Sequence, residues 1–263
     1  MQWENMSWRE LKEACAQCGG VCIVSVGTVE PHGEALPLGT DYLTAHKIAV
    51  EAAAKEQVVT FPPLYLSSVY ESASLCGTVT IKPELLVQLY FNIFDEISRN
   101  GFKKIIVSNG HGGNDPFLRF LGFSALSQRR DYQLHFINGF AFTEEQKRII
   151  EADCEGRARG HACEYETSLM LWCSPEHVHM DRIPGETVDL LRRRKLDDIG
   201  FDGIRWYSIC PDCYCGNANY ATLERGEKYA GFAIENLIKL IRAVKQDTLS
   251  REMYDEFYEK SNM

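Results

Sequence analysis

The sequence has no long hydrophobic run. None of its apolar stretches approaches the roughly 20 residues that a membrane-spanning helix needs, so we expect no transmembrane segment and no membrane partner. The first residues, MQWENMSWRELKEA, are polar and acidic, and they lack the basic start and the apolar centre of a signal peptide. We therefore expect a cytoplasmic protein.

Positive charge is also scarce. The chain has 28 Lys and Arg against 37 Asp and Glu, which gives a formal net charge of -9. A protein that binds nucleic acid by neutralising phosphates needs the opposite balance, so we expect no nucleic-acid partner. The 263 residues contain no internal repeat or flexible linker, and 45% are hydrophobic. Residues 1–263 are therefore predicted to form one domain with a sizeable core.

Cysteine, in contrast, is abundant, with ten residues. Without a signal peptide, these are expected to be free thiols in a reducing compartment. Three of them stand close together in CPDCYCGN, at Cys210, Cys213 and Cys215. Three thiols at this spacing can bind zinc, but no fourth ligand is evident nearby. A structural zinc site is therefore the less favoured alternative to an ordinary loop.

Strand and helix patterns alternate along the chain. Short apolar runs predict strands within residues 21–27, 58–66, 103–107 and 132–140. Helical spacing of apolar residues predicts helices within residues 7–17, 40–56, 82–101, 115–130, 165–175 and 226–248, the last as a long closing helix. This alternation predicts an α/β fold, a three-layer αβα sandwich with a mostly parallel central sheet. Active sites of such sheets lie at the carboxyl ends of the strands.

The first segment with candidate ligands is VGTVEPHGEALPLGTD, residues 26–41, directly after a predicted strand. It places Glu30, His32, Glu34 and Asp41 within twelve residues. Residues two apart in extended backbone project to the same side, so Glu30 and His32 can reach one centre. Imidazole and carboxylates together suit zinc, manganese or another divalent ion. The alternative is that Glu30 caps a turn and His32 is an ordinary loop histidine.

Two further segments carry similar groups. SNGHGGND places His111 among glycines after a strand; the alternative is a phosphate-binding loop, but the spacing fits neither GxGxxG nor a Walker motif. RGHACEYETSLML places His161, Glu164 and Glu166 at the start of an apolar helix. The alternative there is an ordinary helix start in which a glutamate favours the dipole.

Taken together, VGTVEPHGEALPLGTD, NGHGGN and HACEYETSLML resemble the motifs of the creatininase family, creatinine amidohydrolase and its relatives. The usual forms are close to G-S-x-E-Q-H-G-x-H-L-P-L-x-T-D, N-G-H-G-G-N and H-A-G-x-x-E-T-S. NANYATLERGEKYA is similar to a later A-T-x-E-K-G stretch, so the resemblance covers about residues 20–235. It implies a creatininase-like fold and a homohexamer.

The resemblance also implies a site with two divalent ions, zinc or manganese, with iron as a further option. Glu30, Asp41 and His111 match the ligands of one ion, and His32 and Asp41 match ligands of the other, so Asp41 would bridge. Creatinine amidohydrolase completes the second site with a glutamate where this chain has Gly113. The remaining ligand is therefore assigned to Glu166, with Glu164 as the competing candidate.

Catalysis and substrate binding involve residues around these ligands, and His161 and Glu164 both flank the proposed ligand Glu166. His161 and Glu164 are the candidates for proton transfer to the leaving nitrogen. Ser68, Gly112 and His161 are expected to contact the substrate.

Three departures from the family pattern bear on the substrate. Glu34 and Ala35 stand where proline and histidine are common, Cys163 replaces a glycine, and YLSSVYESASLCGTVTI lacks the histidine of a Y-G-x-S-x-x-H pattern. Creatinine itself is therefore doubtful. The expected function is metal-dependent hydrolysis of a carbon–nitrogen bond in a small, cyclic amide. The alternatives are a hydrolase of a cyclic sugar ketone such as a dehydro-inosose, a deformylase, a cofactor-maturing peptidase, or an inactive metal-binding protein.

Overall fold

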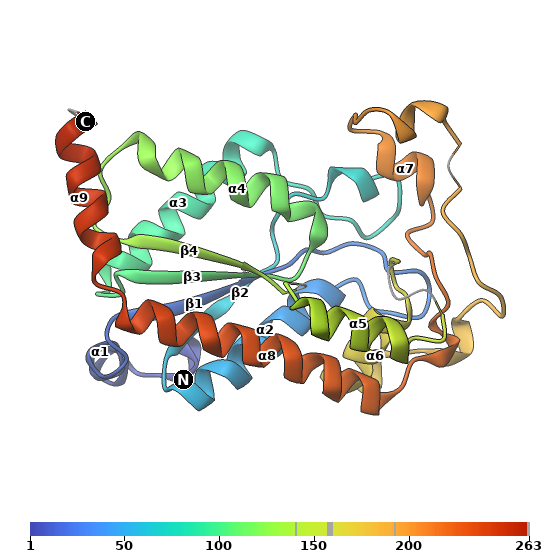
Figure 1. Ribbon diagram of the computed structural model, residues 1–263, viewed down its shortest axis with the longest axis horizontal. Helices are drawn as coiled ribbons and strands as arrows, with labels where there is room; N and C mark the ends of the chain where they lie inside the picture. The colour runs from blue at the N-terminus through green and yellow to red at the C-terminus, as the bar shows by residue number, and fades with distance from the viewer. Residues whose placement is uncertain (140, 157–159, 192, 262–263) are drawn as a thin grey trace.

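A computed structural model describes residues 1–139, 141–156, 160–191 and 193–261. Within these ranges one parallel sheet runs through the molecule with the strand order β2-β1-β3-β4 (Figure 1). Its strands are β1 (Val21–Val26), β2 (Val59–Leu64), β3 (Lys104–Asn109) and β4 (Gln133–Asn138). Each overlaps a segment for which the sequence predicts a strand, and β3 runs two residues past the predicted end at 107. Residue 140, the last of the fourth predicted strand, lies outside the described residues.

Helices cover both faces of this sheet. The α-helices of the described chain are α1 (Trp8–Gln17), α2 (Thr40–Glu56), α3 (Pro83–Arg99), α4 (Asp115–Ser124), α5 (Glu144–Asp153), α6 (Glu164–Cys173), α7 (Arg205–Ile209), α8 (Leu223–Gln246) and α9 (Leu249–Ser261). Helices α2 and α8 pack together on one face, and α3 and α4 lie over the other (Figure 1). The predicted three-layer αβα sandwich is confirmed. No helix in the described ranges is both long and apolar enough to cross a membrane.

Local sequence explains several of these boundaries. Ser7 caps α1 in a reciprocal capping box with Glu10. Every residue of β1 is buried, as expected for an inner strand of a sheet covered on both faces. Strand β2 contains Pro62 and Pro63, which an edge strand tolerates because one side of it donates no ladder hydrogen bonds.

The structure also differs from the sequence-based expectation at the helices. Helices α5, α7 and α9 were not predicted, and α8 is followed by α9 instead of closing the chain. Helix α4 ends at Ser124, six residues before the predicted limit, and a short 3₁₀ turn follows it. The Tyr258 hydroxyl of α9 lies 2.8 Å from the Gln128 carbonyl oxygen. Residues 125–128 are therefore held by a distant helix, which local periodicity does not reveal.

Candidate metal centre

The site lies where β1 and β3 end. The two strands pair in register up to Val26 and Asn109, so the loops that follow them leave the sheet at the same edge. The first turn of α2 meets this edge closely: a Cβ atom on Gly110 would lie only 2.6 Å from the Asp41 carbonyl oxygen. Glycine is therefore needed at this position for α2 to bring Asp41 against the end of β3.

Three side chains from these elements meet at one point. Nδ1 of His111 lies 2.9 Å from Oε1 of Glu30 and 2.9 Å from Oδ2 of Asp41. All three residues are buried, and each offers a ligand atom within 4.8 Å of the others. Two carboxylates and an imidazole at this spacing form a donor set suited to a divalent first-row ion.

The turn that carries His111 is fixed by the asparagines of NGHGGN. The Asn109 side-chain oxygen accepts hydrogen bonds from the His111 backbone N–H (3.1 Å) and from the Asn114 amide (3.2 Å). The Asn109 amide donates to the His111 carbonyl oxygen at 2.8 Å. These contacts hold the backbone on both sides of the ring, so the ring position is set by the turn itself.

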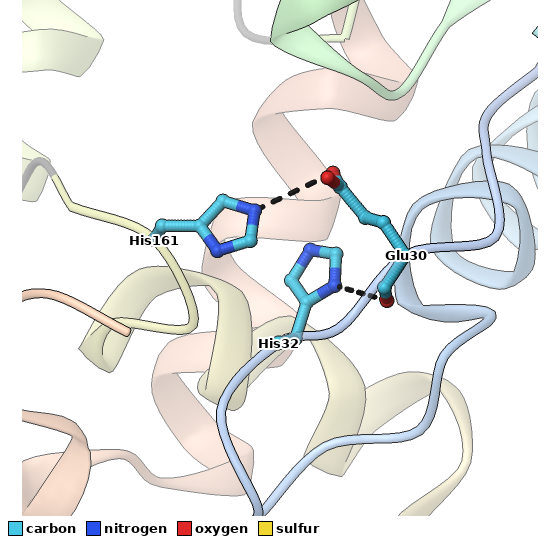
Figure 2. Close-up of side chains that lie close together, drawn as sticks. All are labelled: Glu30, His32 and His161. Atoms are coloured by element: carbon cyan, nitrogen blue, oxygen red, sulfur yellow. Dashed lines mark hydrogen bonds and ion pairs between the residues drawn. The ribbon is translucent and has the colours of Figure 1, made fainter. Parts of the chain in front are cut away.

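His32 lies beside this first group. Its Nε2 is 3.1 Å from Oδ1 of Asp41, while its Nδ1 lies 3.2 Å from the Glu30 carbonyl oxygen (Figure 2). Asp41 thus directs one oxygen toward His32 and the other toward His111. Its two oxygens are therefore available to two different centres.

His161 approaches the cluster from a separate segment. Its Nε2 is 3.4 Å from Oε1 of Glu30 (Figure 2). Its Nδ1 is 2.9 Å from the Cys213 carbonyl oxygen. Its ring stacks on that of His32, with centroids 4.2 Å apart. Glu30, His32 and His161 form a second group whose ligand atoms lie within 4.8 Å of one another.

The two glutamates of EYETS point in different directions. Glu166 lines the cavity above the cluster, and one of its oxygens accepts a 2.5 Å hydrogen bond from the Ala162 backbone N–H. Glu164 is fully buried, with one oxygen 2.7 Å from the Arg225 guanidinium and the other accepting from the Gly156 N–H at 2.8 Å. The structure therefore brings Glu166, and not Glu164, to the wall of the cavity.

Charges in the cluster are balanced by the histidines. Burial would raise the pKa of Glu30, but His111 outweighs it and holds that pKa well below the usual range. Burial lowers the pKa of an imidazole, yet the carboxylates raise the pKa of His111 well above its usual value and that of His161 to about 10. Without a metal, protons on the imidazoles balance the carboxylates; a divalent ion would take the place of such protons.

Buried polar atoms without hydrogen bonds are a second indication that these residues could bind a cation. Nε2 of His32 and Oδ2 of Asp41 are buried polar atoms without a hydrogen bond of ordinary geometry. Buried polar atoms are nearly always hydrogen-bonded, so each of these two atoms indicates a missing partner. Nε2 of His32 faces Oδ1 of Asp41, and Oδ2 faces Nδ1 of His111, so a metal ion in each place would supply that partner.

A cavity of about 840 Å³ opens above the cluster. Ser68 and Gly112, predicted to contact substrate, line it together with His161. Its aromatic lining is formed by Tyr70, Phe117, Phe142, Tyr165, Phe201 and Trp206. The volume is within the range of pockets that take small molecules.

Two residues near the ligands were missed in the sequence. Ser72 donates a 2.6 Å hydrogen bond to Oε2 of Glu30, and Glu71 lines the cavity 3.8 Å from Nε2 of His111. One signal was present: counting from Tyr65, Glu71 stands where the Y-G-x-S-x-x-H pattern has its histidine. This chain therefore has a carboxylate in place of the histidine of the pattern.

The three clustered cysteines do not form a metal site among the described residues. Cys210 and Cys215 share a hydrogen bond, whereas the Cys213 thiol lies 3.5 Å from the Ser72 hydroxyl. Their sulfur atoms are not among the groups close enough to hold one ion. The alternative of a structural zinc site is therefore not supported.

The chain matches one family of known proteins over most of its length. The family model described as Creatininase: Creatinine amidohydrolase matches residues 4–241. The chain belongs to the creatininase family. Members of this family are metal-dependent hydrolases, so the predicted enzyme class is confirmed.

Named relatives of this creatininase-family chain act on different substrates. It is 24% identical to the 3-dehydro-scyllo-inosose hydrolase of Thermotoga maritima, over 93% of this chain and 83% of that protein. It is 24% identical to the creatinine amidohydrolase of Pseudomonas putida, over 68% and 74%. It is 30% identical to the mycofactocin precursor peptide peptidase of Mycolicibacterium smegmatis, over 61% of each chain.

Solved creatininase structures share the fold. A Zn–Zn form of a creatininase variant superposes with a TM-score of 0.80 at 19% identity, covering 94% of this chain and 98% of that one. A manganese form gives a TM-score of 0.77 at 20% identity, covering 94% and 99%. The buried Glu and His groups of this chain can hold a metal, and these structural neighbours are zinc and manganese forms.

Proposed function

We propose that this creatininase-family hydrolase holds two divalent ions and hydrolyses a carbon–nitrogen bond in a small, cyclic amide. The supporting observation is that the two oxygens of Asp41 face different histidines. Oδ1 lies 3.1 Å from Nε2 of His32, and Oδ2 lies 2.9 Å from Nδ1 of His111. A carboxylate placed between two imidazoles in this way could serve as a ligand to both cations.

The ligands are proposed as two overlapping sets. Glu30, Asp41 and His111 would hold one ion, and His32, Asp41 and Glu166 the other. Zinc and manganese are the favoured metals, with Fe²⁺ as a further option. When bound, such a pair lowers the pKa of a shared water toward neutrality and polarises the carbonyl group of the substrate.

His161 is proposed as the group that moves a proton. Its Nδ1 lies 2.9 Å from the Cys213 carbonyl oxygen, so Nδ1 carries a hydrogen and Nε2 is directed toward Glu30 and the cavity. A proton on Nε2 can pass to the leaving nitrogen, which would otherwise depart as a poor leaving group. Ser68 and Gly112, from the wall of the cavity, would contact the substrate.

Glu164, the other residue expected from the sequence to move a proton, is proposed to have a different role. Both of its oxygens are bonded, to Arg225 and to the Gly156 N–H, and it does not line the cavity. We therefore propose that Glu164 anchors the start of α6, which supports His161 and Glu166.

A cyclic sugar ketone is the second candidate substrate. The relative named 3-dehydro-scyllo-inosose hydrolase spans 93% of this chain, a larger share than the creatinine amidohydrolase or the mycofactocin peptidase. The same hydrolytic site would then open a ring at a carbon–carbon bond. The departures at Glu34 and Cys163 are compatible with either substrate.

The test is hydrolysis by the metal-loaded protein of three substrate sets: cyclic amides, small formamides and short peptides, and cyclic polyhydroxy ketones. We expect turnover of a cyclic amide with zinc or manganese, loss of turnover on chelation, and recovery on reloading. Turnover of the ketones alone would favour the second candidate. Metal binding without turnover of any set would contradict both and favour an inactive metal-binding protein.

We further propose that the chain forms a single domain, assembles as a homohexamer and works in the cytoplasm. The family resemblance supports the hexamer, and ten cysteines in the free form suit a reducing compartment. Light scattering on the purified protein should give the mass of six chains; a monomer or dimer would contradict the assembly.

A further inference from the structure

Glu71 lies on the cavity wall opposite a ligand histidine. It belongs to a short 3₁₀ turn, Tyr70–Ser72, and its Oε1 is 3.8 Å from Nε2 of His111. The Glu71 side chain is 24% exposed, whereas that of His111 is 8% exposed. An ordinary N–H···O bond is about 2.9 Å long, so the partly exposed carboxylate has to move by only about 1 Å to bond the ring.

The two ring nitrogens of His111 have different surroundings. Nδ1 faces the carboxylates of Glu30 and Asp41 at 2.9 Å each. Nε2, on the far side, is buried and makes no hydrogen bond of ordinary geometry. If Nδ1 binds a metal ion, the neutral ring carries its hydrogen on Nε2, and this N–H needs an acceptor. The Glu71 carboxylate is the charged group that faces it.

Gly113 creates the space between these two side chains. A Cβ atom at this position would lie 2.4 Å from Oε1 of Glu71 and 2.5 Å from Nε2 of His111. Gly113 is not among the glycines with a positive φ, so its backbone conformation does not require glycine. The requirement is for space, because any side chain here would stand between the carboxylate and the ring.

The same short turn also supports the neighbouring ligand. Ser72 donates a 2.6 Å hydrogen bond to Oε2 of Glu30. The turn is anchored at its other end by the Tyr70 hydroxyl, which donates to the Ile81 carbonyl oxygen at 2.6 Å. Two consecutive residues of one anchored turn therefore face two different ligands of the cluster.

We propose that Glu71 is a positioning residue for His111, accepting a hydrogen bond from its Nε2–H while Nδ1 binds the metal. This inference rests on the proposed function, in which His111 is a ligand. A carboxylate in this position fixes the tautomer and orientation of the ring and makes the ring a stronger ligand. Gly113 permits this hydrogen bond because it has no side chain to stand between the Glu71 carboxylate and the His111 ring.

The test is metal affinity, measured by competition with a chelator on the full-length protein. Glu71→Ala is expected to weaken binding of one ion by about 10–100-fold, and Glu71→Gln by less, since its amide oxygen still accepts a hydrogen bond. Gly113→Ala should weaken the binding of the same ion, although Glu71 is retained. Adding Glu71→Ala to Gly113→Ala should then cause little further loss, because both changes break one contact.

Two controls make the result specific. Glu84→Gln removes an exposed carboxylate close to the same turn and should leave metal affinity unchanged. The absorption spectrum of the Co²⁺-loaded protein should change in Glu71→Ala and not in Glu84→Gln, because it reports ligand geometry. Thermal unfolding of the metal-free variants checks that each is folded.

The outcomes separate the inference from the function on which it rests. A wild-type protein that binds two ions, together with a Glu71→Ala variant of equal affinity and unchanged Co²⁺ spectrum, would overturn the inference alone. A wild-type protein that binds no divalent ion would overturn the proposed function and the inference with it. Loss of affinity in Glu84→Gln equal to that in Glu71→Ala would also overturn the inference.

Discussion

The imidazole ring of His161 stacks on that of His32, with centroids 4.2 Å apart and an angle of 24° between the ring planes. The two histidines come from segments separated by more than a hundred residues, and one is proposed as a ligand while the other is proposed to move a proton. The stacking places the proposed proton donor directly beside the proposed second metal site.

Replacing His161 should therefore separate catalysis from metal binding. His161→Ala is expected to lower kcat by about 10²–10⁴-fold, the usual contribution of a general acid, while metal content stays at the wild-type level. Metal analysis and turnover are measured on the same preparation. His177→Ala, which changes an exposed histidine, is the control. Loss of an ion in His161→Ala would instead identify His161 as a ligand, which its position near Glu30 and His32 allows.

Asp41 is the residue on which both ions should depend. Its oxygens face His32 and His111 separately, so Asp41→Ala is expected to remove both ions and nearly all activity. Elemental analysis of the purified variant measures this directly. Glu34→Ala, which removes an exposed carboxylate from the same loop, should keep both ions. An Asp41→Ala protein with wild-type metal content would disprove the bridging role.

Substitutions of the two glutamates of EYETS should have different effects on metal content and on stability. Glu166→Gln is expected to release one ion with little change in the free energy of unfolding of the metal-free protein, because its amide oxygen still accepts the hydrogen bond from the Ala162 N–H. Glu164→Ala removes the buried acceptor of Arg225 and of the Gly156 N–H, which should lower that free energy by about 1.5–3 kcal/mol. Urea denaturation and metal analysis of both variants test the assignment. The reverse pattern, with metal lost in Glu164→Ala, would identify Glu164 as the ligand.

The sequence predicts the sheet and most of the ligand cluster because both depend on local signals. Strand β1 is a continuous apolar run, and Glu30 and His32 follow it directly, so their position at the sheet edge follows from the chain itself. Glu71 and Ser72 follow no strand, and the one sequence signal for Glu71 is its place at the histidine position of the family pattern. Their role depends on a loop approaching His111 and Glu30 from another part of the chain, and on the space left by Gly113.

Helix prediction was limited for a similar reason. Helix α9 buries few residues, and it is fixed by contacts such as that of Tyr258 with the backbone after α4. Its apolar pattern is therefore weak. The direction of Glu164 is also a tertiary property, because it depends on Arg225 near the start of α8.

Histidine 46 offers a test of pH dependence away from the metal ligands. His46 lies in α2, where its Nδ1 is 3.0 Å from the Ser25 hydroxyl of β1, and burial lowers the pKa of its imidazole below the ordinary value of 6.5. The unfolded chain therefore binds a proton more readily than the folded chain does. His46 should make folding less favourable as the pH falls through 6.5 toward the pKa of the folded state, and should have no such effect well above pH 6.5.

The measurement compares the free energy of unfolding of the metal-free wild type and His46→Gln between about pH 7.5 and about pH 5, a window that contains the ordinary pKa of histidine. The histidines of the metal cluster have raised pKa values and act in the opposite direction, but they are present in both proteins and cancel in the difference. The stability of the variant relative to wild type should therefore rise as the pH falls. A difference that stays constant with pH would mean that the two states of the chain bind a proton at His46 equally well.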